Sequence, residues 1–251
     1  MLFLDVDYDI KDKVKKLGAK WNPNIKKWYV EKEENYNKFA QYILKDFEDA
    51  IVVKDYIYLV VSHQKCWRCK KETEVIALCI PKRIEFKNTP LYRWENGEFD
   101  VDSEEYNYKK FDFSEKEFDI ENTTSYEMIN LRDISKKLLN LIKDKYNYKL
   151  KYSHTTKSSD YANCCQHCDS LQGNFFLFHE IDSPFNVMNK EMARKLTFIK
   201  FKLKNDFILY GYNPPIILIS NYTDEDKNND IKNFSTFIDS KIEIDTVVLR
   251  T

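Results

Sequence analysis

Residues 66–69 read CWRC and residues 164–168 read CCQHC, and these two stretches set the organisation we expect for the whole chain. The last four residues of the second stretch form another C-x-x-C pair. Two such pairs usually present four thiolates to one tetrahedral zinc ion, because two intervening residues let both sulfurs of a pair face the same point. Four protein ligands leave no coordination position for water, so the zinc ion is expected to be structural. The predicted ligands are Cys66, Cys69, Cys165 and Cys168.

Other assignments of the sulfur and histidine side chains stay open at this point. Cys164 could replace Cys165, although the two-residue spacing favours Cys165. His63 and His167 are substitute ligands by position alone. A redox dithiol is less favoured, because neither motif begins a βα unit. Cys79 lies in the apolar run VIALCI and is expected to be a small buried residue.

The size and overall charge of the chain exclude several classes of protein. With 251 residues and 43% hydrophobic residues, it can form one large domain or two smaller ones. Its formal net charge of −1 predicts no bulk attraction to nucleic acid or membrane. The first residues do not resemble a signal peptide, and no apolar run is long enough to span a bilayer. We therefore expect a cytoplasmic protein without a membrane partner, in which disulfides are disfavoured.

Charge is distributed unevenly along the chain. Residues 60–93 contain eight Lys or Arg and three acidic residues, whereas residues 98–127 contain eleven acidic residues and three lysines. The acidic segment is also rich in aromatic residues. We predict an acidic-aromatic insertion with strand character at about residues 98–128. A solvated insertion is the simpler interpretation, and a contact surface for a protein partner is the alternative.

The first 48 residues are predicted to form a small βαββα module. Residues 2–8 alternate apolar and polar side chains, as a half-buried strand does. An apolar stripe with helical spacing follows and ends at Gly18, a typical helix-terminating residue. An Asn-Pro-Asn turn then leads into a strand over residues 27–30, and a second helix is expected from near Glu33.

Residues 2–30, which include the motif KDKVKKLGAKWNPNIKKWYV, resemble a small domain of unknown function found at the front of plasmid-transfer primases. The matching residues are Lys11, Asp12, Leu17, Gly18, Ala19, Trp21, Pro23, Lys27, Trp28, Tyr29 and Val30. The resemblance covers a small part of the chain and implies no activity.

Lysines and aromatic residues crowd both the module and the first C-x-x-C pair. Lysine side chains bind the phosphates of a nucleic-acid backbone, and exposed aromatic rings stack on its bases, so this combination is typical of nucleic-acid binding. Trp21 and Trp28 are nevertheless expected in the core, because a small module needs large apolar residues. The candidate contacts with DNA or RNA are Lys15, Lys16, Lys20, Lys27, Arg68, Lys70 and Lys71.

Beyond a boundary expected at residues 46–55, residues 56–251 are predicted to form a larger mixed α+β domain that contains a split zinc ribbon. Strands on both sides of the first cysteine pair, over residues 57–63 and 72–81, suggest the ribbon. A clear amphipathic helix is expected over residues 133–146. The other expected strands are 148–152, 171–181, a hairpin of 196–203 with 206–212, 214–220 and 241–249.

A second resemblance lies in this part of the chain. The motifs around both cysteine pairs are similar to those of uncharacterised bacterial zinc-ribbon proteins. In the second half they are Tyr152, Thr155, Tyr161, Ala162, Asn163, Cys165, Cys168, Gln172, Gly173, Phe175 and Phe176. The resemblance implies that Cys165 is the ligand in place of Cys164, and it implies no reaction.

No familiar catalytic motif is present. The nearest candidate is His179 with Glu180 and Asp182, since hard carboxylates suit magnesium. On a strand, Glu180 and Asp182 would share one face.

The leading hypothesis is a zinc-stabilised protein that binds nucleic acid without catalysis. The alternatives are a metal-dependent nuclease or hydrolase that uses Glu180 and Asp182, and a protein-interaction module in phage defence or counter-defence.

Overall fold

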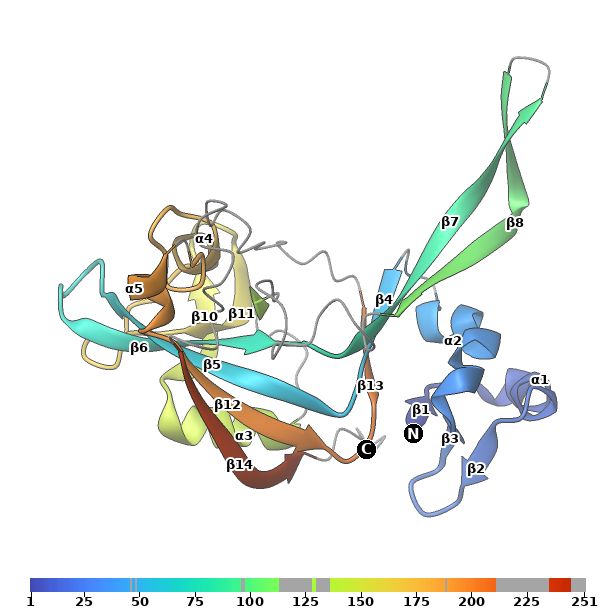
Figure 1. Cartoon of the computed structure of the whole chain (residues 1–251), viewed down its shortest axis with the longest axis horizontal. Helices are drawn as coiled ribbons and strands as arrows, with labels where there is room; N and C mark the ends of the chain where they lie inside the picture. The colour runs from blue at the N-terminus through green and yellow to red at the C-terminus, as the bar shows by residue number, and fades with distance from the viewer. Residues whose placement is uncertain are drawn as a thin grey trace.

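The computed structural model describes residues 1–45, 47, 49–95, 98–112, 128–129, 136–187, 189–210 and 235–244 (Figure 1). Both strands and helices are present among them, which confirms the predicted α+β class. The expected strand over 214–220 lies outside the described residues. So do residues 113–127 of the predicted insertion, the start of the helix predicted over 133–146, and the end of the strand predicted over 241–249.

The N-terminal module has the predicted βαββα order. Its elements are β1 (Leu2–Leu4), the 3-10 turn η1 (Tyr8–Ile10), α1 (Lys11–Lys16), β2 (Lys20–Asn22), β3 (Lys27–Val30), η2 (Glu33–Phe39) and α2 (Ala40–Leu44). β3 pairs with β1 on one side and β2 on the other, both antiparallel. Gly18 follows α1 with φ +100°, a conformation that favours glycine. The Asn22 side chain accepts the N–H of Asn24 at 3.1 Å and so closes the predicted turn.

The core of this module continues into the next part of the chain. Ala50 and Val52 lie in β4 (Asp49–Val53), which occupies half of the segment expected to be a boundary. Both residues share one buried cluster with the module and with Phe86. The hydroxyl of Tyr36 also donates to the Asp206 carboxylate at 2.5 Å. The module is therefore packed against later segments and joined to them by a hydrogen bond.

The remaining elements build the larger part of the protein. They are β5 (Tyr56–Lys65), β6 (Glu72–Cys79), β7 (Arg83–Glu95), β8 (Glu98–Asp112), β9 (Met128–Ile129), α3 (Lys136–Lys145), β10 (Tyr148–Ser153), β11 (Ser158–Asn163), α4 (Asn174–Phe178), α5 (Lys190–Ala193), β12 (Thr197–Leu203), β13 (Phe207–Tyr210) and β14 (Thr236–Ile244). They form sheets of order β14-β12-β5-β6-β9, β13-β4-β7-β8 and β10-β11.

Strand β5 is buried on both faces, which explains its unbroken apolar run. Ile57 and Leu59 share a cluster with Leu138 of α3. Tyr58 and Val60 belong to a second cluster together with residues of α4 and α5. Alternate residues of a strand face opposite sides of its sheet, so β5 contributes to two cores. β5 pairs with β6 up to Lys65 and Glu72, so the first cysteine pair lies at the end of this hairpin.

Two predictions of local structure are wrong. The strands over 196–203 and 206–212 form no hairpin with each other, because β12 pairs with β5 and β14 whereas β13 pairs with β4. Residues 171–181 form no strand, since they contain the helix α4. A short apolar run such as FFLF fits a strand and a buried helical turn equally well, and only the packing of Leu177 and Phe178 against the sheet decides between them.

Strands β7 and β8 form a long antiparallel ribbon that projects from the rest of the protein (Figure 1). β4 pairs with β7 only as far as Lys87, so the ribbon is two-stranded beyond that residue. The strand character predicted for the acidic-aromatic insertion is confirmed over residues 98–112.

Among the helices that the structure describes, none is both long and apolar enough to cross a membrane.

Candidate metal centre

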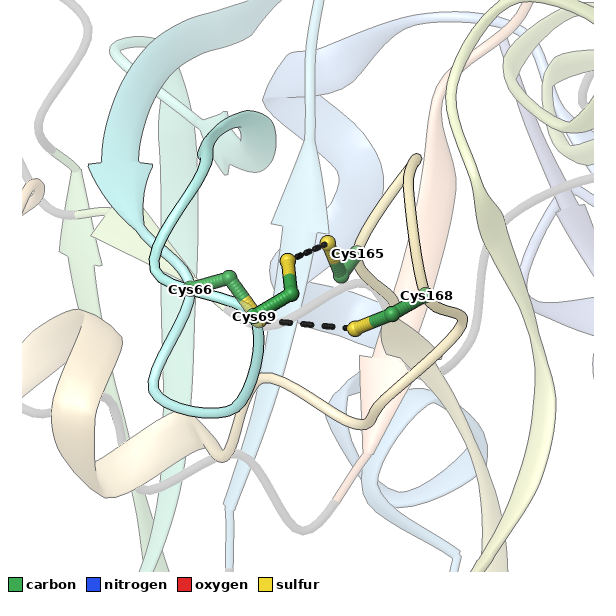
Figure 2. Close-up of side chains that lie close together, drawn as sticks. All are labelled: Cys66, Cys69, Cys165 and Cys168. Carbon is green, nitrogen blue, oxygen red and sulfur yellow. Dashed lines mark hydrogen bonds between the residues drawn. The ribbon is translucent and has the colours of Figure 1, made fainter.

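Two short turns carry the four predicted ligands. The first, residues 66–71, connects β5 to β6, whose last cross-strand pair is Lys65 with Glu72. The second, residues 165–170, follows β11 and is closed by a bridge between Cys164 and Leu171. We call these turns the first and second knuckle. Figure 2 shows their four cysteine side chains converging on one point.

Both knuckles have the same backbone hydrogen bonds. The N–H of Cys66 donates to the carbonyl of Lys71 at 2.9 Å, and the N–H of Lys70 donates back to Cys66 at 3.0 Å. In the second knuckle Cys165 pairs in the same way with Ser170 and Asp169, at 2.9 and 3.0 Å. The residue after the second cysteine has a positive φ in each knuckle, +63° for Lys70 and +60° for Asp169. Cys165 therefore occupies the position in its knuckle that Cys66 occupies in the other.

The four sulfur atoms have the spacing of a tetrahedral thiolate site. Cys66 Sγ lies 3.7 Å from Cys168 Sγ, and Cys69 Sγ lies 3.6 Å from Cys165 Sγ. All four lie within 4.8 Å of one another. Ligands at about 2.3 Å from a tetrahedral ion lie about 3.8 Å apart, whereas a disulfide needs about 2.05 Å. The cysteines are free thiols and could hold a metal ion.

The alternative ligands lie outside this cluster. The Cys164 thiol donates to the carbonyl of Ala162 at 3.8 Å, and its burial raises the pKa of the thiol. His167 Nε2 lies 2.8 Å from the carbonyl of Glu72. His63 Nε2 lies 3.9 Å from a carboxylate oxygen of Glu74. Cys79 is buried in the core, as expected.

Hydrogen bonds to the sulfur atoms of Cys66 and Cys168 favour the thiolate form that binds metals. A hydrogen bond from the Lys71 backbone lowers the pKa of Cys69, but burial and contacts with the three neighbouring thiols outweigh it and raise this pKa to about 11. Burial by itself raises the pKa of the Cys66 thiol. Hydrogen bonds from the Ser170 hydroxyl and nearby backbone N–H groups outweigh this effect and bring the pKa down to about 5. The Ser170 hydroxyl lies 3.2 Å from Cys66 Sγ and 3.1 Å from Cys168 Sγ. This hydroxyl and the Ser170 backbone also lower the pKa of Cys168. The Gln172 amide adds a contact to Cys66 Sγ at 3.5 Å.

One buried amide attaches the second knuckle to the main sheet. Asn163 is only 3% exposed. Its side chain accepts the N–H of Ile76 at 2.8 Å and donates to the Ile76 carbonyl at 3.0 Å. The amide thus takes the place of a neighbouring strand on β6. In the sequence, Asn163 was part of the motif around the second cysteine pair and Ser170 was not singled out. No short-range pattern indicated their partners, which are distant in the chain.

The negative charge of the second knuckle is balanced by strand β10. Lys149 and Lys151 place their ammonium groups 2.5 and 2.6 Å from the Asp169 carboxylate. Together with the Asn147 amide they hold the pKa of Asp169 well below its usual range. Asn147 also donates to the Cys165 carbonyl at 2.8 Å, so these contacts fix the knuckle itself.

The candidate nucleic-acid contacts fall into two groups at opposite ends of the protein (Figure 1). Arg68, Lys70 and Lys71 are exposed on the first knuckle. The lysines of the N-terminal module form the other group. Lys15 and Lys16 are exposed there, Lys27 is half-buried, and Lys20 forms an ion pair with Glu31.

The expectation that both tryptophans of the module are buried is wrong for one of them. Trp28 is partly buried against the core of the module. Trp21 is 48% exposed, and its ring centroid lies 5.4 Å from that of Trp28. It is on the three-residue strand β2, which lies at the edge of its sheet among the described strands.

The geometry expected for a carboxylate site is also wrong. Glu180 and Asp182 lie in the exposed turn after α4, so no strand holds them on one face. Within the described residues, the four cysteines are the group of His, Cys, Asp and Glu side chains that could hold a metal ion.

Comparison with known proteins identifies one region. Residues 1–43 match a family described as a domain of unknown function, DUF5710. This match supports the small N-terminal domain and does not reach the metal centre. It shows no relationship to primases or to zinc-ribbon proteins. No curated protein and no solved structure matches the chain.

Proposed function

We propose that the four cysteines bind one structural Zn²⁺ ion and that the hairpin β5–β6 presents the first knuckle to nucleic acid. Soft thiolate ligands suit zinc, and a closed four-sulfur site leaves no position for substrate. Cys66 and Cys165 are fully buried, so the ion would be shielded from solvent on that side. The centre would therefore hold the two knuckles together and perform no chemistry.

The observation that carries the nucleic-acid proposal is the set of side chains on the first knuckle. Arg68, Lys70 and Lys71 are exposed within one six-residue turn, beside the exposed ring of Trp67. Glu72 is the adjacent exposed acid. The acid of the second knuckle is already balanced by two lysines. A cationic turn with an aromatic residue is suited to phosphates and bases.

Neutralising the first knuckle is expected to weaken nucleic-acid binding and its salt dependence. The triple variant Arg68→Gln, Lys70→Gln, Lys71→Gln should reduce the slope of log affinity against log salt by up to about 2 for a single strand, since each phosphate contact contributes about 0.7. Fluorescence anisotropy with zinc-loaded protein measures this slope.

The matched control is Lys15→Gln, Lys16→Gln, Lys27→Gln, which removes the same charge from the opposite end. If only this control loses affinity, the interface lies on the N-terminal module. An unmodified protein that binds no oligonucleotide contradicts the proposal. Gel analysis of the same samples covers the nuclease alternative, which requires magnesium-dependent cleavage that Glu180→Ala abolishes.

The β7–β8 ribbon favours a second candidate function, which is binding of a protein partner. A two-stranded ribbon is marginally stable on its own, so a partner that packs on it would stabilise it. Residues 89–107 contain six acidic residues and one arginine, together with several aromatic residues. Such a ribbon suits a partner with basic and apolar side chains and repels nucleic acid.

Shortening the ribbon is expected to separate the two candidate functions. Asn88 pairs with Tyr108, so residues 89–107 can be replaced by an Asn-Gly turn without disturbing the pairing with β4. The shortened protein should keep its nucleic-acid affinity and lose any protein partner recovered by affinity purification. A partner retained equally by both proteins would exclude the ribbon as the contact.

A further inference from the structure

The exposure of Trp67 is not explained by hydration of its polar atom. Its indole N–H donates to the carbonyl of Leu171 at 2.8 Å, although the side chain is 60% exposed. The hydrogen bond joins the first knuckle to the residue that follows the second. The ring is thus held in one orientation, and what remains open to solvent is apolar aromatic surface.

Helix α4 adds two more exposed rings close to this point in the chain. Phe175 is 58% exposed and Phe176 is 54% exposed, and their ring centroids lie 5.6 Å apart. Gln172 contacts Cys66 Sγ, so the chain passes beside the first knuckle just before it enters α4. Figure 2 shows the segment after the second knuckle passing the Cys66–Cys69 turn. Five residues span at most about 18 Å, so Phe176 lies within that reach of Leu171.

Charge around these rings suggests where a polyanion would run. The cations Arg68, Lys70 and Lys71 are on the same turn as Trp67. The acids Glu180 and Asp182 follow the other end of α4. Phosphates are therefore favoured over the first knuckle, and bases over the rings, with the backbone kept away from the end of α4.

We propose that Trp67 and the rings of Phe175 and Phe176 form a stacking site for single-stranded nucleic acid, with Arg68 and Lys70 holding its phosphates. The inference rests on the proposed function and assigns the strandedness of its ligand. A single strand offers unpaired base faces to exposed aromatic rings, whereas a duplex hides them within its stack.

The test compares three labelled 12-mers, namely single-stranded DNA, single-stranded RNA of the same sequence and duplex DNA, by anisotropy with zinc-loaded full-length protein. At least one single strand should bind more tightly than the duplex. Trp67→Ala should weaken its binding by about 5- to 150-fold, the range for loss of one stacked base. Trp67→Phe, which lacks the N–H but keeps a ring, should stay much closer to the unmodified protein. The exposed tryptophan at the other end provides the control, and Trp21→Ala should leave affinity unchanged.

Zinc content and melting temperature of each variant show whether the knuckle is intact. Equal affinity for duplex, or unchanged binding by Trp67→Ala, overturns the stacking site. If Trp67→Phe binds as weakly as Trp67→Ala, the role of Trp67 is its hydrogen bond to Leu171, and the stacking site is again wrong. In these cases the knuckle charge variant still decides the proposed function by itself. An absence of binding to all three oligonucleotides overturns both, and a protein ligand for the rings would then be the alternative.

Discussion

Serine in place of Cys165 is expected to abolish metal binding, whereas serine in place of the adjacent Cys164 should leave the metal bound. Cys165 Sγ lies 3.6 Å from Cys69 Sγ inside the cluster, and Cys164 lies outside it. Structural zinc contributes about 10–16 kcal/mol in small zinc-finger peptides, so losing one ligand of a closed site should have a large effect on stability. Cys164→Ser should cost only about 1–2 kcal/mol, since the new hydroxyl can donate to the Ala162 carbonyl as the thiol does.

Elemental analysis of the purified proteins provides the measurement, together with thermal unfolding before and after treatment with a chelator. One zinc per chain is expected for the unmodified protein and for Cys164→Ser, and close to none for Cys165→Ser. If Cys165→Ser keeps its zinc and Cys164→Ser loses it, then Cys164 is the ligand and the assignment of Cys165 is wrong. Stoichiometric iron in place of zinc would contradict the proposed metal and leave the four-sulfur site intact.

Alanine in place of Asn163 is expected to lower the free energy of unfolding by about 2–5 kcal/mol. The substitution leaves both backbone groups of Ile76 without their partners in a buried place, and each such group costs about 1–3 kcal/mol. Asn163→Asp should be costly as well despite its equal size, because a carboxylate oxygen would then face the Ile76 carbonyl. Zinc affinity should fall too, since this amide attaches the second knuckle to β6.

Urea unfolding of zinc-saturated protein measures the effect. Asn186→Ala is the control, because it removes an exposed amide that donates to the Glu180 carbonyl, and it should change stability by about 0.5 kcal/mol or less. If Asn163→Ala and Asn186→Ala are equally stable, the contact with Ile76 does not contribute as proposed.

Local rules accounted for the parts of the fold whose partners are close in sequence. Gly18 after α1 and Asn22 in the turn before β3 act within a few residues, so the βαββα module was predictable. The two-residue spacing of each cysteine pair fixes a knuckle in the same way, and it identified the four residues that the structure brings together.

Other features depended on partners that no local pattern specifies. The alternating sequence of β12 predicts a strand but does not specify which strand it pairs with. In the structure β12 pairs with the buried strand β5 and not with β13, which follows it closely in the sequence. The exposure of Trp21 follows from the edge position of β2 and not from its residue type.

The sequence by itself determined the α+β class, the N-terminal module and the four candidate ligands, because each depends on residue type and short-range spacing. Only the tertiary structure decided that the two cysteine pairs meet at one point, that Asn163 pairs with β6, and that the two lysine groups lie at opposite ends. These features depend on how distant segments pack, and that packing is set by the burial of apolar side chains from many segments in shared cores.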